Sequence, residues 1–134
     1  MVNENRPEYP RSLGCKIKDA MGDTRVVLIS GPRQSGKTTL AKKLTNEDRH
    51  YVTLDDEGVY QAARADPVGF IRQFKPVTID EIQRVPELIR EIKIAVDADQ
   101  RPGRFLLTGS ANILTIPTLS ESLAGRMAVC ALLP

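Results

Sequence analysis

The sequence contains few of the residues that build metal clusters, disulfide frameworks or base-stacking surfaces. Among its 134 residues there are two Cys, one His and no Trp. Cys15 and Cys130 lie far apart and no Cys-x-x-Cys pair occurs, so counting ligands supports neither a zinc site nor a disulfide framework. Three Tyr and three Phe are the only aromatic residues, and this scarcity argues against a stacking platform for single-stranded nucleic acid.

Long apolar runs and long runs of one charge are also missing. The longest apolar stretch, Met127 to Leu133, is far shorter than the roughly 18 residues that span a bilayer, and residues 1–10 have no apolar centre of a signal peptide. We therefore expect a cytoplasmic protein without a membrane partner. Lys and Arg number 19 against 17 Asp and Glu and are scattered, so the charge pattern neither indicates nor excludes nucleic acid as a partner.

What the sequence does contain is an alternation of short apolar runs with segments of helical periodicity. A hydrophobic content of 41% and a charged content of 27% are ordinary for one soluble globular domain. We predict strands at 25–30, 51–54, 77–82, 104–108 and 127–133, and helices at 36–44, 57–65, 66–74, 86–99 and 119–124. Short buried strands joined by helical crossovers predict an α/β fold with a parallel five-stranded sheet and helices on both faces.

A glycine-rich loop follows the first predicted strand and opens the first predicted helix. Residues 31–38, GPRQSGKT, fit the phosphate-binding pattern G-x-x-x-x-G-K-[ST]. Gly31 and Gly36 permit the positive φ and close approach that let backbone N–H groups point at phosphate oxygens. We expect Lys37 to reach the β- and γ-phosphates and the Thr38 hydroxyl to coordinate Mg²⁺. The candidate nucleotide-binding residues are Gly31, Pro32, Arg33, Gln34, Ser35, Gly36, Lys37, Thr38 and Thr39.

The third predicted strand ends in two carboxylates, Asp80 and Glu81. A strand end of this kind, beside a phosphate loop, is where a Mg²⁺ ion and an attacking water are held. We expect Asp80 to hold the magnesium shell. We expect Glu81, on the opposite strand face, to orient or deprotonate the water as a general base. The acids at 55–57 fit better as caps of the following helix.

Polar residues also follow the fourth predicted strand, and an arginine precedes the fifth. Ser110 is our first choice as a sensor of the γ-phosphate, with Thr108 and Asn112 as rivals and a plain turn as the alternative. Arg126, at the end of a short helix, is placed to project from the subunit edge toward a neighbour's phosphate, which implies a homo-oligomer. A surface arginine is the alternative reading.

Five segments taken together resemble one family. They are Tyr9-Pro-Arg11, GPRQSGKTTL, VTIDEIQ, LLTGSAN and SLAGR, and in this order they are similar to the prokaryotic AAA+ ATPases of the AAA family 14 group. The resemblance implies the sheet order 5-1-4-3-2, and a helical lid and a further domain after the core. The sequence stops at Pro134, right after the fifth predicted strand. We therefore expect a lead-in segment at 1–24 and an ATP-binding core at 25–134, truncated before the lid.

The leading functional hypothesis is Mg²⁺-dependent binding and hydrolysis of ATP, with weak activity of the isolated chain. GTP is disfavoured, because the segment Asp80-Glu-Ile-Gln83 does not match the D-x-x-G pattern of GTPases and no N-K-x-D occurs. The first alternative is a switch or scaffold that binds ATP with little turnover. A small-molecule kinase is the weakest alternative, because no acceptor-binding segment is recognisable.

Overall fold

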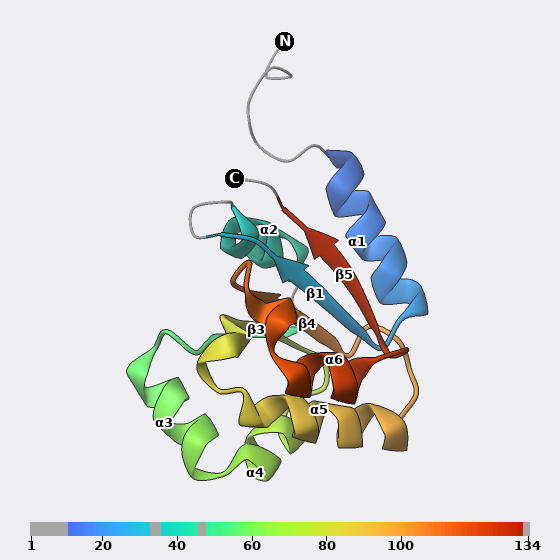
Figure 1. The fold of residues 1–134 in the computed structure, drawn as a ribbon. Helices are drawn as coiled ribbons and strands as arrows, with labels where there is room; N and C mark the ends of the chain where they lie inside the picture. Colours follow the sequence, from blue (N-terminus) through green and yellow to red (C-terminus); the bar gives the residue numbers. More distant parts are fainter. Residues whose placement is uncertain (1–10, 33–35, 46–47, 133–134) are drawn as a thin grey trace.

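A five-stranded parallel sheet forms the middle layer of the molecule (Figure 1). The computed structural model describes residues 11–32, 36–45 and 48–132. The strands are β1 (Val26–Ser30), β2 (His50–Thr53), β3 (Val77–Asp80), β4 (Phe105–Gly109) and β5 (Met127–Ala131). Their order is β2-β3-β4-β1-β5, and each neighbouring pair is parallel. This is the predicted order 5-1-4-3-2 read from the other edge, so the predicted fold class is confirmed.

Helices cover both faces of this sheet (Figure 1). They are α1 (Arg11–Asp23), α2 (Lys37–Leu44), α3 (Glu57–Ala65), α4 (Pro67–Arg72), α5 (Glu87–Ala98) and α6 (Pro117–Leu123), with short 3-10 turns η2 (Ile82–Arg84) and η3 (Ile113–Thr115). Five of the helices match predicted segments to within a few residues. None in the described ranges is long and apolar enough to cross a membrane.

Successive side chains along each strand point to opposite faces of the sheet, so a central strand can contribute to two separate cores. In β1, Val26 and Leu28 face the larger core, which packs against α3, α4, α5 and α6. Val27 and Ile29 face the smaller core, which packs against α1 and α2. All five residues of β1 are buried, as are all five of β4. The central strands are therefore covered on both sides, as expected for a parallel sheet.

We did not predict α1, because the charged residues of its sequence resemble a polar lead-in. Ile17, Ala20 and Met21 nevertheless pack on the smaller core. Their spacing of three and four residues is the signal of one apolar helix face. The lead-in at 1–24 thus contains a helix that covers the same sheet as the rest of the chain. The boundary at residue 25 stays a prediction.

Candidate functional site

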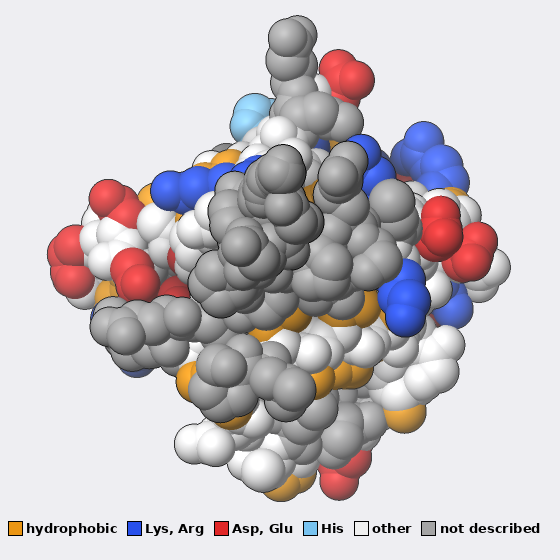
Figure 2. Space-filling view, turned by 90° about the horizontal axis from the view of Figure 1, so that it is seen from above, with side chains coloured by type: hydrophobic (Ala, Val, Ile, Leu, Met, Phe, Trp, Pro, Cys, Tyr) orange, Lys and Arg blue, Asp and Glu red, His pale blue; other side chains and the backbone are white. Residues whose placement is uncertain are grey.

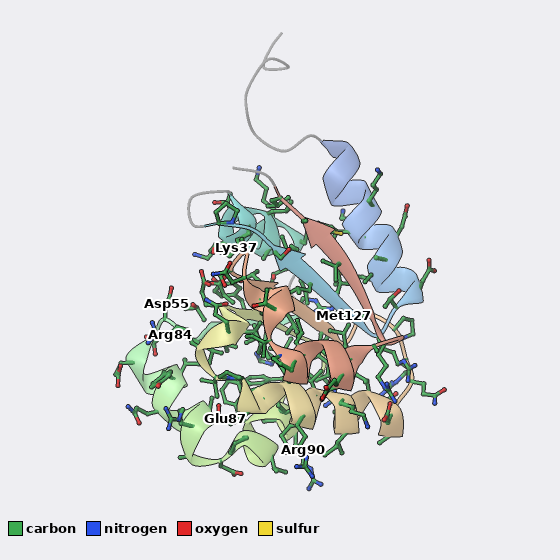
Figure 3. All side chains as sticks on the ribbon, viewed as in Figure 1. Lys37, Asp55, Arg84, Glu87, Arg90 and Met127 are labelled. Carbon is green, nitrogen blue, oxygen red and sulfur yellow. The ribbon has the colours of Figure 1, made fainter. Side chains whose placement is uncertain are left out.

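Residues of the predicted site meet at the carboxyl ends of the parallel strands. Lys37 opens α2, which follows β1; Asp80 ends β3; Thr108 lies in β4. β4 lies between β1 and β3, so one strand separates the loop strand from the acidic strand. The labelled side chains Lys37, Asp55 and Arg84 lie on the same side of the molecule (Figure 3). Residues far apart in the sequence therefore share one edge of the sheet.

Gly36 takes the backbone conformation that the phosphate-loop pattern predicts. Its φ of 88° is left-handed, and it is the residue before the first turn of α2. Gly31, in contrast, is not among the glycines with positive φ, which in the described residues are Gly36, Gly103 and Gly125. Its N–H donates to Gly109 O at 3.1 Å and extends the pairing of β1 with β4, so the expectation of positive φ at both glycines is wrong for Gly31.

The other loop residues are placed to different degrees. Arg33, Gln34 and Ser35 lie outside the described residues, so their predicted contacts stay predictions. Pro32 is half-buried and Thr39 is exposed.

Lys37 and Glu81 form a buried ion pair. Lys37 Nζ lies 3.2 Å from Glu81 Oε2, and the two residues are 3% and 8% exposed. An ammonium and a carboxylate buried this deeply need each other or another charged partner, because desolvation penalises either one alone. The three donors of the ammonium leave room for an additional anion such as a phosphate.

Asp80 is surrounded by hydroxyl groups from three elements. Its Oδ1 accepts from Thr38 Oγ1 at 2.9 Å and from Thr108 Oγ1 at 2.7 Å, and its Oδ2 accepts from Thr53 Oγ1 at 3.0 Å. Burial and the nearby Asp80 carboxylate raise the pKa of the Tyr51 phenol above its usual range. These donors fix the orientation of the carboxylate. Its contact with the Thr38 hydroxyl brings together two oxygen ligands of the kind that Mg²⁺ prefers.

Glu81 does not continue the strand as predicted. β3 ends at Asp80, and Glu81 adopts φ 61° and ψ 52°, a left-handed conformation that is uncommon for a residue with a side chain. Its N–H donates to Thr108 Oγ1 at 2.9 Å, and η2 begins at the next residue. The prediction that Glu81 lies on the opposite face of the strand is therefore wrong. The left-handed turn allows the carboxylate to meet Lys37.

Asp55 joins the two predicted acids. One carboxylate oxygen from each of Asp55, Asp80 and Glu81 lies within 4.8 Å of the others, a grouping that could hold a metal ion. Asp55 is exposed and also lies 3.3 Å from Arg84 Nη1. We predicted a capping role for the acids at 55–57, and this is confirmed for Asp56, whose Oδ2 accepts the Val59 N–H at 3.0 Å. Asp55 was missed because only sheet pairing brings β2 beside β3.

The three candidate sensors occupy different environments. Thr108 is fully buried and contacts both Asp80 and the backbone of Glu81. Ser110 is half-buried, and its backbone N–H donates to Gln83 Oε1 at 3.2 Å. Asn112 is exposed and precedes η3. Ser110 stays our predicted sensor, and Thr108 is the candidate in direct contact with the acids.

Arg126 lies at the amino ends of the strands, opposite to the carboxyl ends where the predicted site residues meet. Its backbone O accepts the N–H of Val26 at 3.3 Å, at the start of β1, whereas the phosphate loop follows the end of β1. Five strand residues span about 16 Å. The guanidinium binds Asp97 through Nε at 2.6 Å and Nη2 at 3.1 Å, and these bonds hold the pKa of Asp97 below its usual range. Arg126 is therefore not brought to the site of its own chain.

Charged side chains of both signs lie on one face of the molecule. Figure 2 views it from above, with described Lys and Arg side chains and described Asp and Glu side chains around its rim. Outside the grey area, the visible charges are thus of both signs, whereas a surface that binds a nucleic acid backbone is predominantly basic.

Comparison with known proteins gives one family. A family model of an AAA domain, AAA_14, matches residues 23–134. Two uncharacterized proteins, Mb2031c of Mycobacterium bovis and Rv2008c of Mycobacterium tuberculosis, are each 40% identical to the chain over 119 residues. The match covers 87% of the chain but 27% of each relative, so the chain spans about a quarter of the length of these curated relatives.

Three solved structures are similar in fold. AMPPCP-bound DnaA from Aquifex aeolicus has a TM-score of 0.63 at 15% identity, covering 98% of this chain and 48% of that one. A DNA replication initiation factor has a TM-score of 0.62 at 12% identity, covering 91% and 44%. A Walker-type ATPase of Pyrococcus abyssi has a TM-score of 0.58 at 14% identity, covering 98% and 57%. At these identities the likeness concerns the fold alone.

Proposed function

The chain belongs to the AAA domain family, with the fold of the phosphate-loop ATPases, and we propose that it binds ATP with Mg²⁺ and hydrolyses it to ADP and inorganic phosphate. The observation that carries the proposal is the junction of α2 with β3. Thr38 Oγ1 donates to Asp80 Oδ1 at 2.9 Å, and Lys37 Nζ donates to Glu81 Oε2 at 3.2 Å. A cation for the phosphates, a pair of metal ligands and a candidate base are thus held together by one buried and one partly buried hydrogen bond.

Each of these residues has a distinct part in the proposed reaction. Lys37 and the first N–H groups of α2 stabilise negative charge on the phosphates. Thr38 and Asp80 would hold Mg²⁺, which neutralises phosphate charge when bound. Glu81 accepts a proton from the water whose oxygen attacks the γ-phosphorus, and the bond from that phosphorus to the bridging oxygen of ADP breaks.

A nucleotide-dependent switch with little turnover is the second candidate, and the position of Arg126 favours it. Because this arginine is bound to Asp97 at the far edge of the sheet, it can reach a phosphate only in a neighbouring subunit. We propose that a homo-oligomer supplies it. Without that contact, the chain would bind ATP and turn it over slowly.

Two substitutions separate binding from turnover. We expect Lys37→Ala to abolish tight binding of ATP in calorimetry, because the loop loses the cation that contacts the terminal phosphates. Glu81→Gln keeps the size of the side chain but cannot accept a proton, so we expect binding to survive while the single-turnover rate falls by about 10²-fold or more.

Lys43→Ala is the matched control, because Lys43 is exposed on the same helix. Tight ATP binding by Lys37→Ala would overturn the phosphate-loop assignment. An unchanged single-turnover rate in Glu81→Gln would remove Glu81 as the base, and loss of ATP binding in that variant would assign it to metal binding instead.

A further inference from the structure

Gln83 joins the acidic end of β3 to the end of β4, and the mechanism above gives it no part. Its Nε2 donates to Glu81 Oε1 at 2.8 Å, and its Oε1 accepts the Ser110 backbone N–H at 3.2 Å. The side chain comes from η2, the turn that directly follows Glu81, and is half-buried. Gln83 therefore lies between the candidate base and the loop that carries the candidate sensor.

The two partners of Gln83 allow only one orientation of its amide. The Ser110 N–H can only donate, so it requires the amide oxygen. The ionised carboxylate of Glu81 can only accept, so it requires the amide NH₂. A flipped amide would lose both hydrogen bonds. The orientation of Gln83 is thus fixed by the network itself.

Gln83 also restrains the carboxylate of Glu81. Lys37 holds Oε2 and Gln83 holds Oε1, so each carboxylate oxygen has a different partner. The last torsion of a glutamate side chain is broad and weakly restricted by itself. With Lys37 as the only partner, the carboxylate could rotate and follow the ammonium, which the phosphates also attract. The amide of Gln83 provides a second, uncharged contact that opposes this movement.

We propose that Gln83 is a positioning residue for hydrolysis, which orients Glu81 toward the attacking water by linking its carboxylate to the backbone of Ser110. This inference rests on the proposed hydrolysis and deepens it. A general base works only within hydrogen-bond reach of the proton that it removes. A displacement of about 1 Å at a reacting group can cost about 10²-fold in rate.

The test compares four proteins: the parent chain, Gln83→Met, Glu81→Gln and the double variant. Single-turnover hydrolysis at saturating Mg-ATP gives the rate, and calorimetry gives the Kd for ATP. We expect Gln83→Met to lower the rate about tenfold or more and to leave the Kd within about twofold of the parent. In the Glu81→Gln background the same substitution should have no further effect, because residues that act as a unit are not additive.

Two further variants separate positioning from a general structural role. Gln83→Glu keeps an acceptor for the Ser110 N–H but places a second carboxylate against Glu81, so its rate should fall at least as far. Gln61→Met is the matched control: Gln61 Nε2 donates to Glu57 Oε2 at 2.8 Å on the exposed face of α3. This pair has the same chemistry away from the site, and its loss should leave the rate unchanged.

The outcomes distinguish the inference from the function on which it rests. A parent rate in both Gln83 variants, or an equal loss in the Glu81→Gln background, would overturn the positioning role and leave hydrolysis intact. A parent chain that binds ATP but is no faster than Glu81→Gln would overturn the base role of Glu81 and the role of Gln83 with it. A chain that binds no ATP would overturn the proposed function itself.

Discussion

At the scale of the single residue, Thr108 organises the acidic end of β3. Its hydroxyl donates to Asp80 Oδ1 at 2.7 Å and accepts the Glu81 N–H at 2.9 Å, and the residue is fully buried. One oxygen atom therefore fixes both the carboxylate of one acid and the backbone of the next. This contact also supplies a partner for the N–H of Glu81 where the backbone leaves the strand.

We expect Thr108→Val to lower the free energy of unfolding by about 1–3 kcal/mol, because it leaves the buried Glu81 N–H without a partner and removes one of the two donors to Asp80 Oδ1. Urea denaturation measures this change. Thr115→Val is the control: Thr115 is exposed, and its hydroxyl donates to Asn112 O at 2.7 Å, so its change should stay within about 0.5 kcal/mol. Equal effects of the two substitutions would contradict the special place of Thr108.

At the scale of the element, α5 shows how one amphipathic helix packs against the sheet that carries the predicted site. Its buried residues Leu88, Ile89, Ile92 and Val96 lie on one face and join the larger core. Ile94, on the same helix, is 49% exposed. The sequence periodicity predicts this division, since apolar residues three and four positions apart share a helix face.

Ile92 and Ile94 make a matched pair for testing the packing of α5. We expect Ile92→Ala to destabilise the fold by about 2–5 kcal/mol, because it opens a cavity in a close-packed core. Ile94→Ala removes the same atoms at an exposed position and should cost less than about 1 kcal/mol. Chemical denaturation of the two variants measures the difference, and similar losses of stability would contradict the core assignment.

At the scale of the whole molecule, the common direction of the strands separates two groups of proposed functional residues. The predicted phosphate loop and the acids lie at the carboxyl ends, and Arg126 lies before β5 at the amino ends. In Figure 3, Met127, the residue after Arg126, lies apart from Lys37. The length of β1, about 16 Å, separates Arg126 from the predicted phosphate loop. Rotation of one side chain does not span this length, so a phosphate could meet Arg126 only from a second molecule.

This separation predicts how activity depends on concentration. If association assembles the site, the hydrolysis rate per chain should rise with protein concentration. Arg126→Ala should abolish this rise while sparing ATP binding. An arginine supplied by a neighbour contributes on the order of 10³-fold to the rate. Arg101→Ala is the control, because it removes another exposed arginine–aspartate pair, with Arg101 Nη2 2.6 Å from Asp99 Oδ2. Flat and equal activities in the parent and Arg126→Ala would refute the role of Arg126 in trans.

The local chemistry of the site could be predicted from the sequence because it depends on neighbours in the chain. The left-handed Gly36, the helix that starts at Lys37 and the acid that ends β3 all follow from short-range patterns of glycine, charge and apolar residues. The parallel sheet order was implied by the family resemblance and confirmed. The strand directions that bring Thr38 to Asp80 then follow from helical crossovers.

Contacts between distant segments were decided only by the tertiary structure, because a polar side chain carries no sequence signal for the partner it meets. Arg49 looks like a surface residue in the sequence, yet it is buried, donates to Val77 O at 2.6 Å and has its pKa lowered to about 10 by burial. Asp55 resembles a helix cap, and sheet pairing brings it beside Asp80. Glu81 leaves its strand in a left-handed turn, and its N–H donates to Thr108 of the neighbouring strand. The sequence by itself determined which chemical groups the site holds, and the packing of the sheet determined which of them touch.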